Sequence, residues 1–148
     1  MAADLPKEGT WSGTYTGMGT YKATQIGPDR ALVYLDVTGL VLSSGFPDHM
    51  TIHCWGTDNY TKGMGQFSGY CVGTDPAGDQ IAWDCPPSEK HTMDQKSYRG
   101  SCTFTTGTGK YTGVSGGNTY ETHGSEFRPV ADGVFVLYNI LQGNYKLP

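Results

Sequence analysis

The sequence predicts an all-β domain, an antiparallel up-and-down β-barrel of about eight strands, and three observations favour this fold class. The chain of 148 residues contains 22 glycines and 10 tyrosines, while only 16% of its residues are charged. Threonine recurs at Thr103, Thr105, Thr106 and Thr108, so β-branched and aromatic strand formers accompany abundant turn formers. Turn signals return about every 8–12 residues, which is typical of a sandwich or a barrel. Helix formers are too sparse for a helical bundle.

The turns divide the chain into strands that are expected at 10–24, 31–37 (resuming at 40–42), 49–56, 65–74, 80–85, 97–105, 118–123 and 133–145. Gly17 and Gly19 mark a place where the first strand can bend. The dipeptide Pro86-Pro87 ends the fifth strand, because neither residue donates a backbone hydrogen bond to a ladder. Residues 58–62 are predicted to turn, and the glycine-rich segment 107–117 is expected to hold one short helical turn.

Short turns between consecutive strands favour an up-and-down meander, and closing the meander removes its exposed edges. A closed barrel of eight strands is just wide enough to be filled by side chains or to hold one small ligand. The domain is expected to span residues 1–148, with an extended N-terminal segment at 1–9.

Four cysteines, Cys54, Cys71, Cys85 and Cys102, fall on the third to sixth expected strands. Each neighbouring pair lies symmetrically about the turn between its strands, so all four can form one row across the sheet. Opposed Cβ atoms are about 4.5–5.5 Å apart, close to what a disulfide needs. The pairs Cys54–Cys71 and Cys85–Cys102 would use every cysteine, whereas Cys71–Cys85 would leave two unpaired.

Two other states of the cysteines remain open from the sequence. They are reduced, buried thiols that act as small hydrophobic groups, or a zinc site made of all four, although no close C-x₂₋₄-C pair is present. Disulfides would place the protein in an oxidising compartment, either periplasmic or secreted; the alternative is the cytoplasm. The residues Ala2-Ala3-Asp4 resemble the downstream edge of a signal-peptide cleavage site, and Met1 would then be a start residue added to a mature exported protein.

The row of cysteines also defines two faces of the predicted sheet. The cysteine face carries Ile52, Phe67, Ile81, Trp83, Tyr98 and Phe104. The opposite face is polar but includes His53, Trp55, Tyr70, Asp84 and Arg99. Burial of apolar area favours the cysteine face as the barrel core. In the inverted arrangement the polar face would line a cavity, with Trp55, Tyr70 and His53 as ligand-binding residues and His53, Tyr70, Asp84 and Arg99 as candidate catalytic residues.

Several function classes lack support in the sequence. The net charge is −4 with no basic patch, which argues against a nucleic-acid partner, and no apolar run approaches a membrane helix of about 20 residues. His49 and His53 are about 13 Å apart on a strand, too far to share a metal ion, so neither a metal nor a cofactor is predicted. The run Gly107-Thr108-Gly109-Lys110 lacks the full spacing of a phosphate loop. His123, near Glu121 and Glu126, fits a solvated strand end better than acid–base chemistry.

The last strand is apolar on both of its faces from Val134 to Leu141, interrupted only by Asn139. Such a strand needs cover on both sides, which chain ends or a second copy can supply. A homo-dimer or homo-trimer is therefore expected.

The run Gly100-Ser101-Cys102-Thr103-Phe104, followed by Thr106-Gly107-Thr108-Gly109-Lys110-Tyr111 and a glycine-rich turn, resembles the allene oxide cyclase and dirigent barrel families. The resemblance covers about 25 residues and implies an eight-stranded barrel with an interior pocket for a hydrophobic molecule, assembled as a dimer or trimer. Those families cyclise or couple unsaturated lipids and phenolics, but none of their catalytic residues can be matched here. Gly9-Thr10-Trp11 also resembles the opening Gly-x-Trp of lipocalins and avidins.

Three hypotheses follow for the function. The first is a barrel that binds a small hydrophobic or aromatic molecule in its interior, with or without transforming it. The second is a cyclase, isomerase or lyase of the allene oxide cyclase type, which needs a buried titratable pair. The third is a structural or interaction domain whose barrel is filled with side chains.

Overall fold

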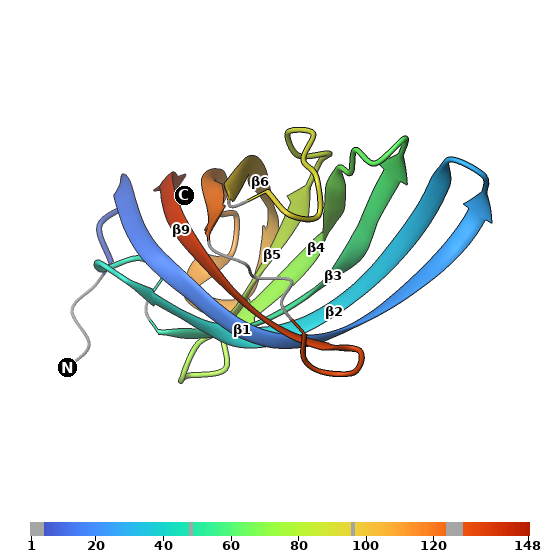
Figure 1. Cartoon of the computed structure of the whole chain (residues 1–148). Coiled ribbons are helices and arrows are strands. Elements are labelled where there is room, and N and C mark those ends of the chain that lie inside the picture. Colours follow the sequence, from blue (N-terminus) through green and yellow to red (C-terminus); the bar gives the residue numbers. More distant parts are fainter. Residues whose placement is uncertain (1–4, 48, 96, 124–128) are drawn as a thin grey trace.

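The computed structural model describes residues 5–47, 49–95, 97–123 and 129–148. Its strands, shown in Figure 1, are β1 (Glu8–Gly27), β2 (Arg30–Ser43), β3 (Met50–Thr61), β4 (Phe67–Thr74), β5 (Gln80–Cys85), β6 (Ser97–Gly107), β7 (Ser115–His123), β8 (Pro129–Ala131) and β9 (Val134–Lys146). The short helix η1 (Gly109–Tyr111) is the helical turn predicted from the sequence. No helix in these described ranges is long and apolar enough to span a membrane.

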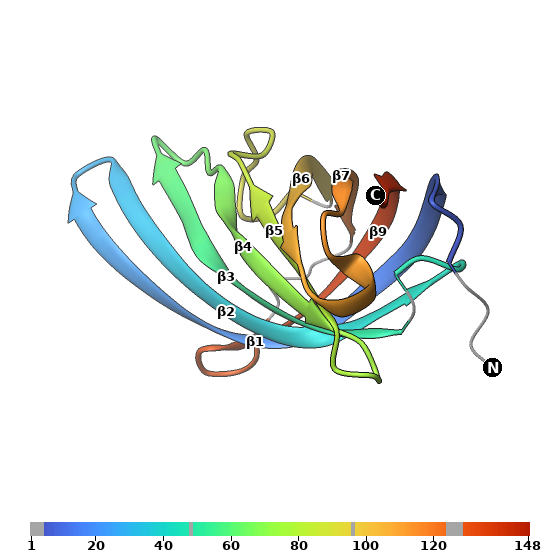
Figure 2. The same ribbon diagram turned by 180° about the vertical axis from the view of Figure 1, so that it is seen from behind.

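The strands form one sheet in the order β1-β2-β3-β4-β5-β6-β7-β9-β8, with every neighbouring pair antiparallel. The long strand β1 pairs with β2 on one side and with β9 on the other, which closes the sheet. Figure 2 shows β5, β6 and β7 side by side, with β9 next to β7. The predicted closed antiparallel barrel of eight strands is therefore confirmed, and the three-residue strand β8 is an addition that the sequence did not predict.

The strands β2 and β3 extend further than the sequence predicts. β2 continues through Gly39 without a break, and β3 runs to Thr61 although a turn was expected from Asp58. Asp58 and Tyr60 continue the inward alternation of β3, and both are buried. A charged residue at the predicted turn is thus part of the barrel interior, and its burial requires a partner.

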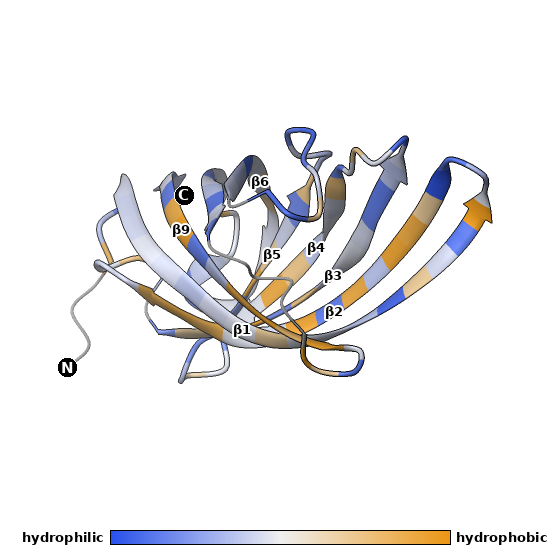
Figure 3. Ribbon diagram, viewed as in Figure 1, coloured by the Kyte–Doolittle hydropathy of each residue, from blue (hydrophilic) through white to orange (hydrophobic). Residues whose placement is uncertain are grey.

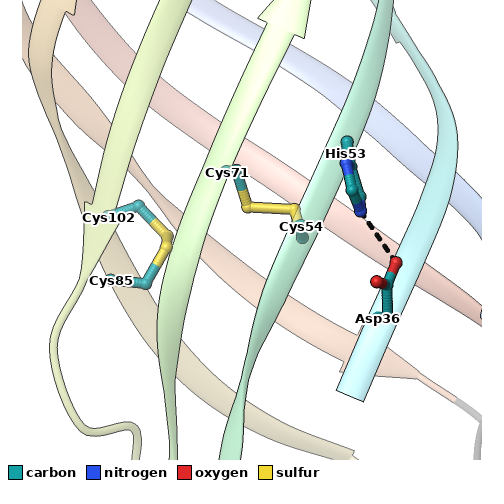
Figure 4. The surroundings of a disulfide bond; sticks show 6 residues. All are labelled: Asp36, His53, Cys54, Cys71, Cys85 and Cys102. Atoms are coloured by element: carbon teal, nitrogen blue, oxygen red, sulfur yellow. Dashed lines mark hydrogen bonds and ion pairs between the residues drawn. A yellow bond between two sulfur atoms is a disulfide. The ribbon is translucent and has the colours of Figure 1, made fainter.

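Both predicted disulfides are present: Cys54–Cys71 joins β3 to β4, and Cys85–Cys102 joins β5 to β6 (Figure 4). Cys54 lies directly opposite Cys71 in the ladder. The hairpin between β4 and β5 differs from the prediction, because Cys71 lies opposite Trp83 rather than Cys85. A slip of two residues leaves the same side chains on the same face, so the cysteines still share one face of the barrel.

The cysteine face is the inside of the barrel, as burial of apolar area predicts. Its large side chains Ile52, Ile81, Trp83, Tyr98 and Phe104 are at most 7% exposed. On the opposite face, Tyr70 is 55% exposed, and Asp84 and Arg99 are also exposed. The inverted arrangement, with the polar face lining a cavity, is therefore not the one that the chain adopts.

One end of the barrel is closed by an aromatic cluster around Phe46. Phe46, in the loop from β2 to β3, is 1% exposed and stacks on Tyr145 with 3.8 Å between ring centroids. Its edge contacts involve Trp11, Phe104 and Tyr111 at 5.8–6.3 Å. Each such pair contributes about 0.5–1.5 kcal/mol beyond area burial, so this cluster plugs the barrel firmly.

Candidate functional site

A cavity of about 90 Å³ lies in the barrel interior, between the aromatic cluster and the opposite end. Both disulfides line it, together with aliphatic and aromatic side chains from most of the strands. Val37 and Leu141 contribute apolar wall on β2 and β9, while Trp11 and Tyr15 come from β1. The site is thus a mainly apolar cavity built from alternating inward residues of distant segments.

Four polar atoms of the cavity-lining residues have no hydrogen-bond partner within the described chain. They are the indole Nε1 of Trp11, the hydroxyls of Tyr15 and Tyr120, and the side-chain oxygen Oδ1 of Asn139. Buried polar atoms are nearly always paired, and an unpaired one costs about 1–3 kcal/mol. The four atoms comprise a donor, two hydroxyls that can donate or accept, and an acceptor, so this wall offers hydrogen bonds that the protein itself does not use.

Three tyrosines on the cavity wall are held in their neutral form. Burial raises the pKa of Tyr15, of Tyr98 and of Tyr120, and the nearby Asp58 carboxylate raises the last two further. Their hydroxyls are therefore hydrogen-bond donors or acceptors at physiological pH and supply no phenolate base. The chemistry of the wall suits recognition of a polar group on an otherwise apolar molecule.

Behind one wall of the cavity lies a buried ion pair between Asp58 on β3 and His91 in the loop before β6. The Nε2 atom of His91 is 2.8 Å from Oδ2 of Asp58, and both side chains are at most 2% exposed. His91 Nδ1 faces the backbone oxygen of Glu89 at 3.2 Å, and the His91 ring stacks on Tyr98 at 3.8 Å. Neither member of the pair lines the cavity, so Tyr98 separates the pair from it.

The pair fastens the loop that follows β5 to the barrel. The backbone of His91 exchanges two hydrogen bonds with Gly65, at 3.0 and 2.7 Å, so the loop is bound to the β3–β4 hairpin. Burial lowers the pKa of His91, but the hydrogen bond and charge of Asp58 outweigh burial, and the net direction is upward. The sequence predicts a turn at residues 58–62, which include Asp58, and does not single out His91. Continued alternation from Met50 through Tyr60 was the signal that could have placed Asp58 inside.

The predicted site residues lie on the outer face, and the structure brings some of them together. Trp55, Tyr70 and Asp84 are successive neighbours across β3, β4 and β5. His53 lies beside Trp55, with 4.8 Å between ring centroids, and its Nε2 atom is 2.7 Å from Oδ1 of Asp36 (Figure 4). Arg99 stands apart, because its Nε donates to Glu121 at 2.7 Å on the next strand.

The structure also gives the contacts of two other motifs noted in the sequence, His123 with its acidic neighbours and the run that ends at Lys110. His123 pairs with Glu121 at 2.7 Å, while Glu126 falls outside the described residues. Lys110 is engaged with the buried carboxylate of Asp75, which also accepts a hydrogen bond from the Tyr111 hydroxyl at 3.1 Å. The lysine of the supposed phosphate loop is thus a tether for η1. Within the described ranges no three His, Cys, Asp or Glu side chains are grouped as a metal site would need.

The chain was compared with family models, curated proteins and solved structures. No family model matches the chain, and no curated protein matches it. Among solved structures, the pterocarpan synthase dirigent protein GePTS1 has a TM-score of 0.47 and 9% sequence identity, over 100% of this chain and 94% of that one. The closed barrel itself rests on the strand pairing described above.

Proposed function

We propose that this protein binds a small, largely apolar or aromatic molecule in the cavity of its barrel. The observation that supports this most is the set of unpaired polar atoms of Trp11, Tyr15, Tyr120 and Asn139 in an apolar lining. A ligand with one or two hydrogen-bonding groups would pair with these atoms and would remove the free-energy cost of leaving them unpaired. Shape and polarity of the site therefore point to the same class of ligand.

The cavity sets the size of the ligand. Its volume of about 90 Å³ is below the roughly 300–1,000 Å³ of drug-sized pockets, and an apolar protein cavity of about 150 Å³ accommodates benzene. The cavity is smaller than the one that holds benzene, so we propose a molecule of no more than one ring, such as phenol, which the wall accommodates by small shifts of its side chains. A larger ligand would require the aromatic side chains of the wall to rearrange.

Binding without transformation is the form of this function that the site supports best. A cyclase, isomerase or lyase needs a base or acid that touches its substrate. The titratable groups of the cavity wall are three phenols whose pKa values burial raises, and the His91–Asp58 pair lies behind Tyr98. The wall is thus arranged to hold a ligand rather than to move its protons.

Filling the cavity is expected to abolish binding. Phenol should raise the melting temperature of the wild-type protein, because a ligand that binds only the folded state stabilises it. Val37→Phe places a ring in the cavity and should remove the shift. Val33→Phe, the same change at a buried β2 position outside the cavity, should cost about 1–3 kcal/mol of stability and keep the shift.

The hydrogen-bonding part of the proposal has its own variant. Tyr15→Phe should weaken phenol binding several-fold, leave benzene binding unchanged and cost little stability, since the hydroxyl has no partner. If neither phenol nor benzene shifts the wild-type melting temperature, the interior is a filled core and the third hypothesis, a structural domain, replaces this one.

We further propose that the protein forms a homo-oligomer through the outer face of β9, β1 and β2. Exposed apolar residues gather there in register: Leu40 and Tyr138 flank Thr16, while Leu42 and Ile140 flank Thr14. Figure 3 shows hydrophobic residues along both β2 and β9. These four apolar side chains carry no charge, so two copies can meet without like-charge repulsion, and burying such a patch is favourable.

A charge placed in this patch is expected to dissociate the assembly. Light scattering coupled to size exclusion should report a dimer or trimer for the wild-type protein and a monomer for Leu40→Lys. Val130→Lys, an exposed position on β8 outside the patch, should leave the mass unchanged. A monomeric wild-type protein at micromolar concentration would contradict the proposal.

The redox state supports a proposal about location. All four cysteines are paired, and disulfides form and persist in oxidising compartments. We therefore propose a periplasmic or secreted protein, which fractionation of the native cells would test.

A further inference from the structure

A second hollow lies on the outside of the barrel, across β2 to β5. Its volume is about 450 Å³, within the range of small-molecule sites. Trp55 and Tyr70 stand side by side along one edge, where they are direct cross-strand neighbours. In the next row, Thr57 and Ser68 oppose each other and are small, so they form the floor. The hollow therefore results from a row of large side chains beside a row of small ones.

Large side chains also bound the two ends of this floor. Tyr34 lies opposite Thr57 on β2, and the dipeptide Pro86-Pro87 flanks the hollow after β5. Tyr34 is 47% exposed and Tyr70 is 55% exposed, while Trp55 is half-buried. Three aromatic rings from three adjacent strands thus surround one space, an arrangement that we call the outer aromatic groove.

The groove carries negative charge without a compensating cation. Asp84, the neighbour of Tyr70 on β5, lines it and is exposed, and no ion pair to Asp84 is present within the described chain. No lysine, arginine or histidine is among the residues that line the groove. The nearest ladder partner with a positive charge is Lys22, which lies opposite Tyr34 on β1, beyond that ring. The site is complementary to a cation.

A supporting contact orients the central ring. His53 packs against Trp55 on the side away from the floor, at 4.8 Å between centroids, and Asp36 holds His53 at 2.7 Å. Fixing these groups restricts the indole before any ligand arrives, which reduces the entropy lost on binding. His53 is therefore a positioning residue for Trp55.

We propose that the outer aromatic groove binds a small, soluble quaternary ammonium compound. The faces of Trp55, Tyr34 and Tyr70 attract a cation through their quadrupoles, and the methyl groups of a quaternary ammonium are apolar enough to lie against the rings. The Asp84 carboxylate supplies the counter-charge. A primary ammonium fits less well, because it is strongly hydrated and seeks hydrogen-bond acceptors that the rings lack.

Choline and its neutral isostere 3,3-dimethylbutan-1-ol form the decisive pair of probes. They share shape and hydroxyl, and only choline is charged. Titration calorimetry at fixed ionic strength should show choline binding, with the isostere at least tenfold weaker. Tyr70→Ala and Asp84→Asn should each weaken choline binding about three- to fivefold, as expected for exposed cation–π and ionic contacts. Asp29→Asn, an equal change of charge at an exposed turn, should leave binding unchanged.

Fluorescence locates the binding event. Trp55 is the tryptophan on the outer face, whereas Trp11 and Trp83 are 4% exposed in the core, so choline should change emission in the wild type and not in Trp55→Phe. His53→Gln should weaken choline less than Trp55→Ala does. Equal binding of the isostere, tighter binding of glucose than of choline, or no binding of choline at millimolar concentration each overturns the proposal. None of these outcomes bears on phenol binding in the interior, which is a separate site.

Discussion

Replacing His91 with alanine is expected to lower the free energy of unfolding by about 3–5 kcal/mol, the largest effect of any single substitution predicted here. The change leaves the Asp58 carboxylate buried at 1% exposure without its partner at 2.8 Å. It also removes the imidazole that stacks on Tyr98, while the backbone hydrogen bonds between residue 91 and Gly65 can remain. Urea denaturation followed by tryptophan fluorescence measures the loss. An unchanged slope of the unfolding free energy against urea concentration would show that the substitution does not act through the unfolded state.

A second substitution tests whether the loss in His91→Ala comes from an unpaired buried charge or from the cavity that the imidazole leaves. Asp58→Asn removes the buried charge, so the double variant Asp58→Asn/His91→Ala should be more stable than His91→Ala alone. A cavity left by the imidazole would instead make the two losses add. Loss of less than 1 kcal/mol in His91→Ala would mean that water replaces the imidazole and that the pair does not fasten the loop.

The same pair predicts a pH dependence. The pKa of His91 is raised in the folded protein, so folding favours the protonated imidazole. Its stabilising contribution is fully present below about pH 6.5, the unfolded value, and is lost as the pH rises through the folded pKa. The difference in unfolding free energy between the wild type and His91→Gln should therefore shrink between pH 5.5 and pH 8.5. A difference that is constant or grows with pH would contradict the direction of the shift.

The sequence predicted the barrel well because its information is local. Turn residues and alternation fixed seven of the strands nearly to their ends, and symmetric spacing about two hairpins placed Cys54 opposite Cys71 and Cys85 beside Cys102. Even the misplaced β4–β5 register shifted by two, which preserved the faces. Parity is thus more robust than register, and the inside of the barrel followed from it.

The functional surroundings were less predictable, because they depend on contacts between distant segments. Asp58 and His91 are 33 residues apart, and nothing in the local sequence of either one indicates that the two form a pair. Phe46 lies in a loop with no strand pattern, yet it closes one end of the barrel. Tyr70 and Asp84, two of the four residues expected to converge on an interior ligand, are neighbours on the outer wall, whereas Arg99 stands apart. Sequence alone gives the neighbours of such residues and not the curvature that decides which face encloses space.

Removing both disulfides is expected to lower the free energy of unfolding by about 6 kcal/mol, with about 3 kcal/mol from each. Each bond closes a loop between cysteines 17 positions apart, and restricting the unfolded chain is the main source of its stabilisation. Small domains are stable by about 5–15 kcal/mol, so the reduced protein should be marginal at 37 °C. Urea denaturation with and without a reductant, alongside the double variants Cys54→Ser/Cys71→Ser and Cys85→Ser/Cys102→Ser, measures each contribution.

The two bonds should contribute almost independently, because each closes a different hairpin of the meander and their loops do not overlap. Both also line the interior cavity, so their loss would expose thiols or hydroxyls to an apolar chamber. Serine should accordingly cost more than alanine at Cys85 and Cys102, which are 2% and 9% exposed. Equal losses for serine and alanine would mean that loop closure alone accounts for the stabilisation. A combined loss below 2 kcal/mol would mean that the unfolded chain is already restricted when the two disulfides are absent.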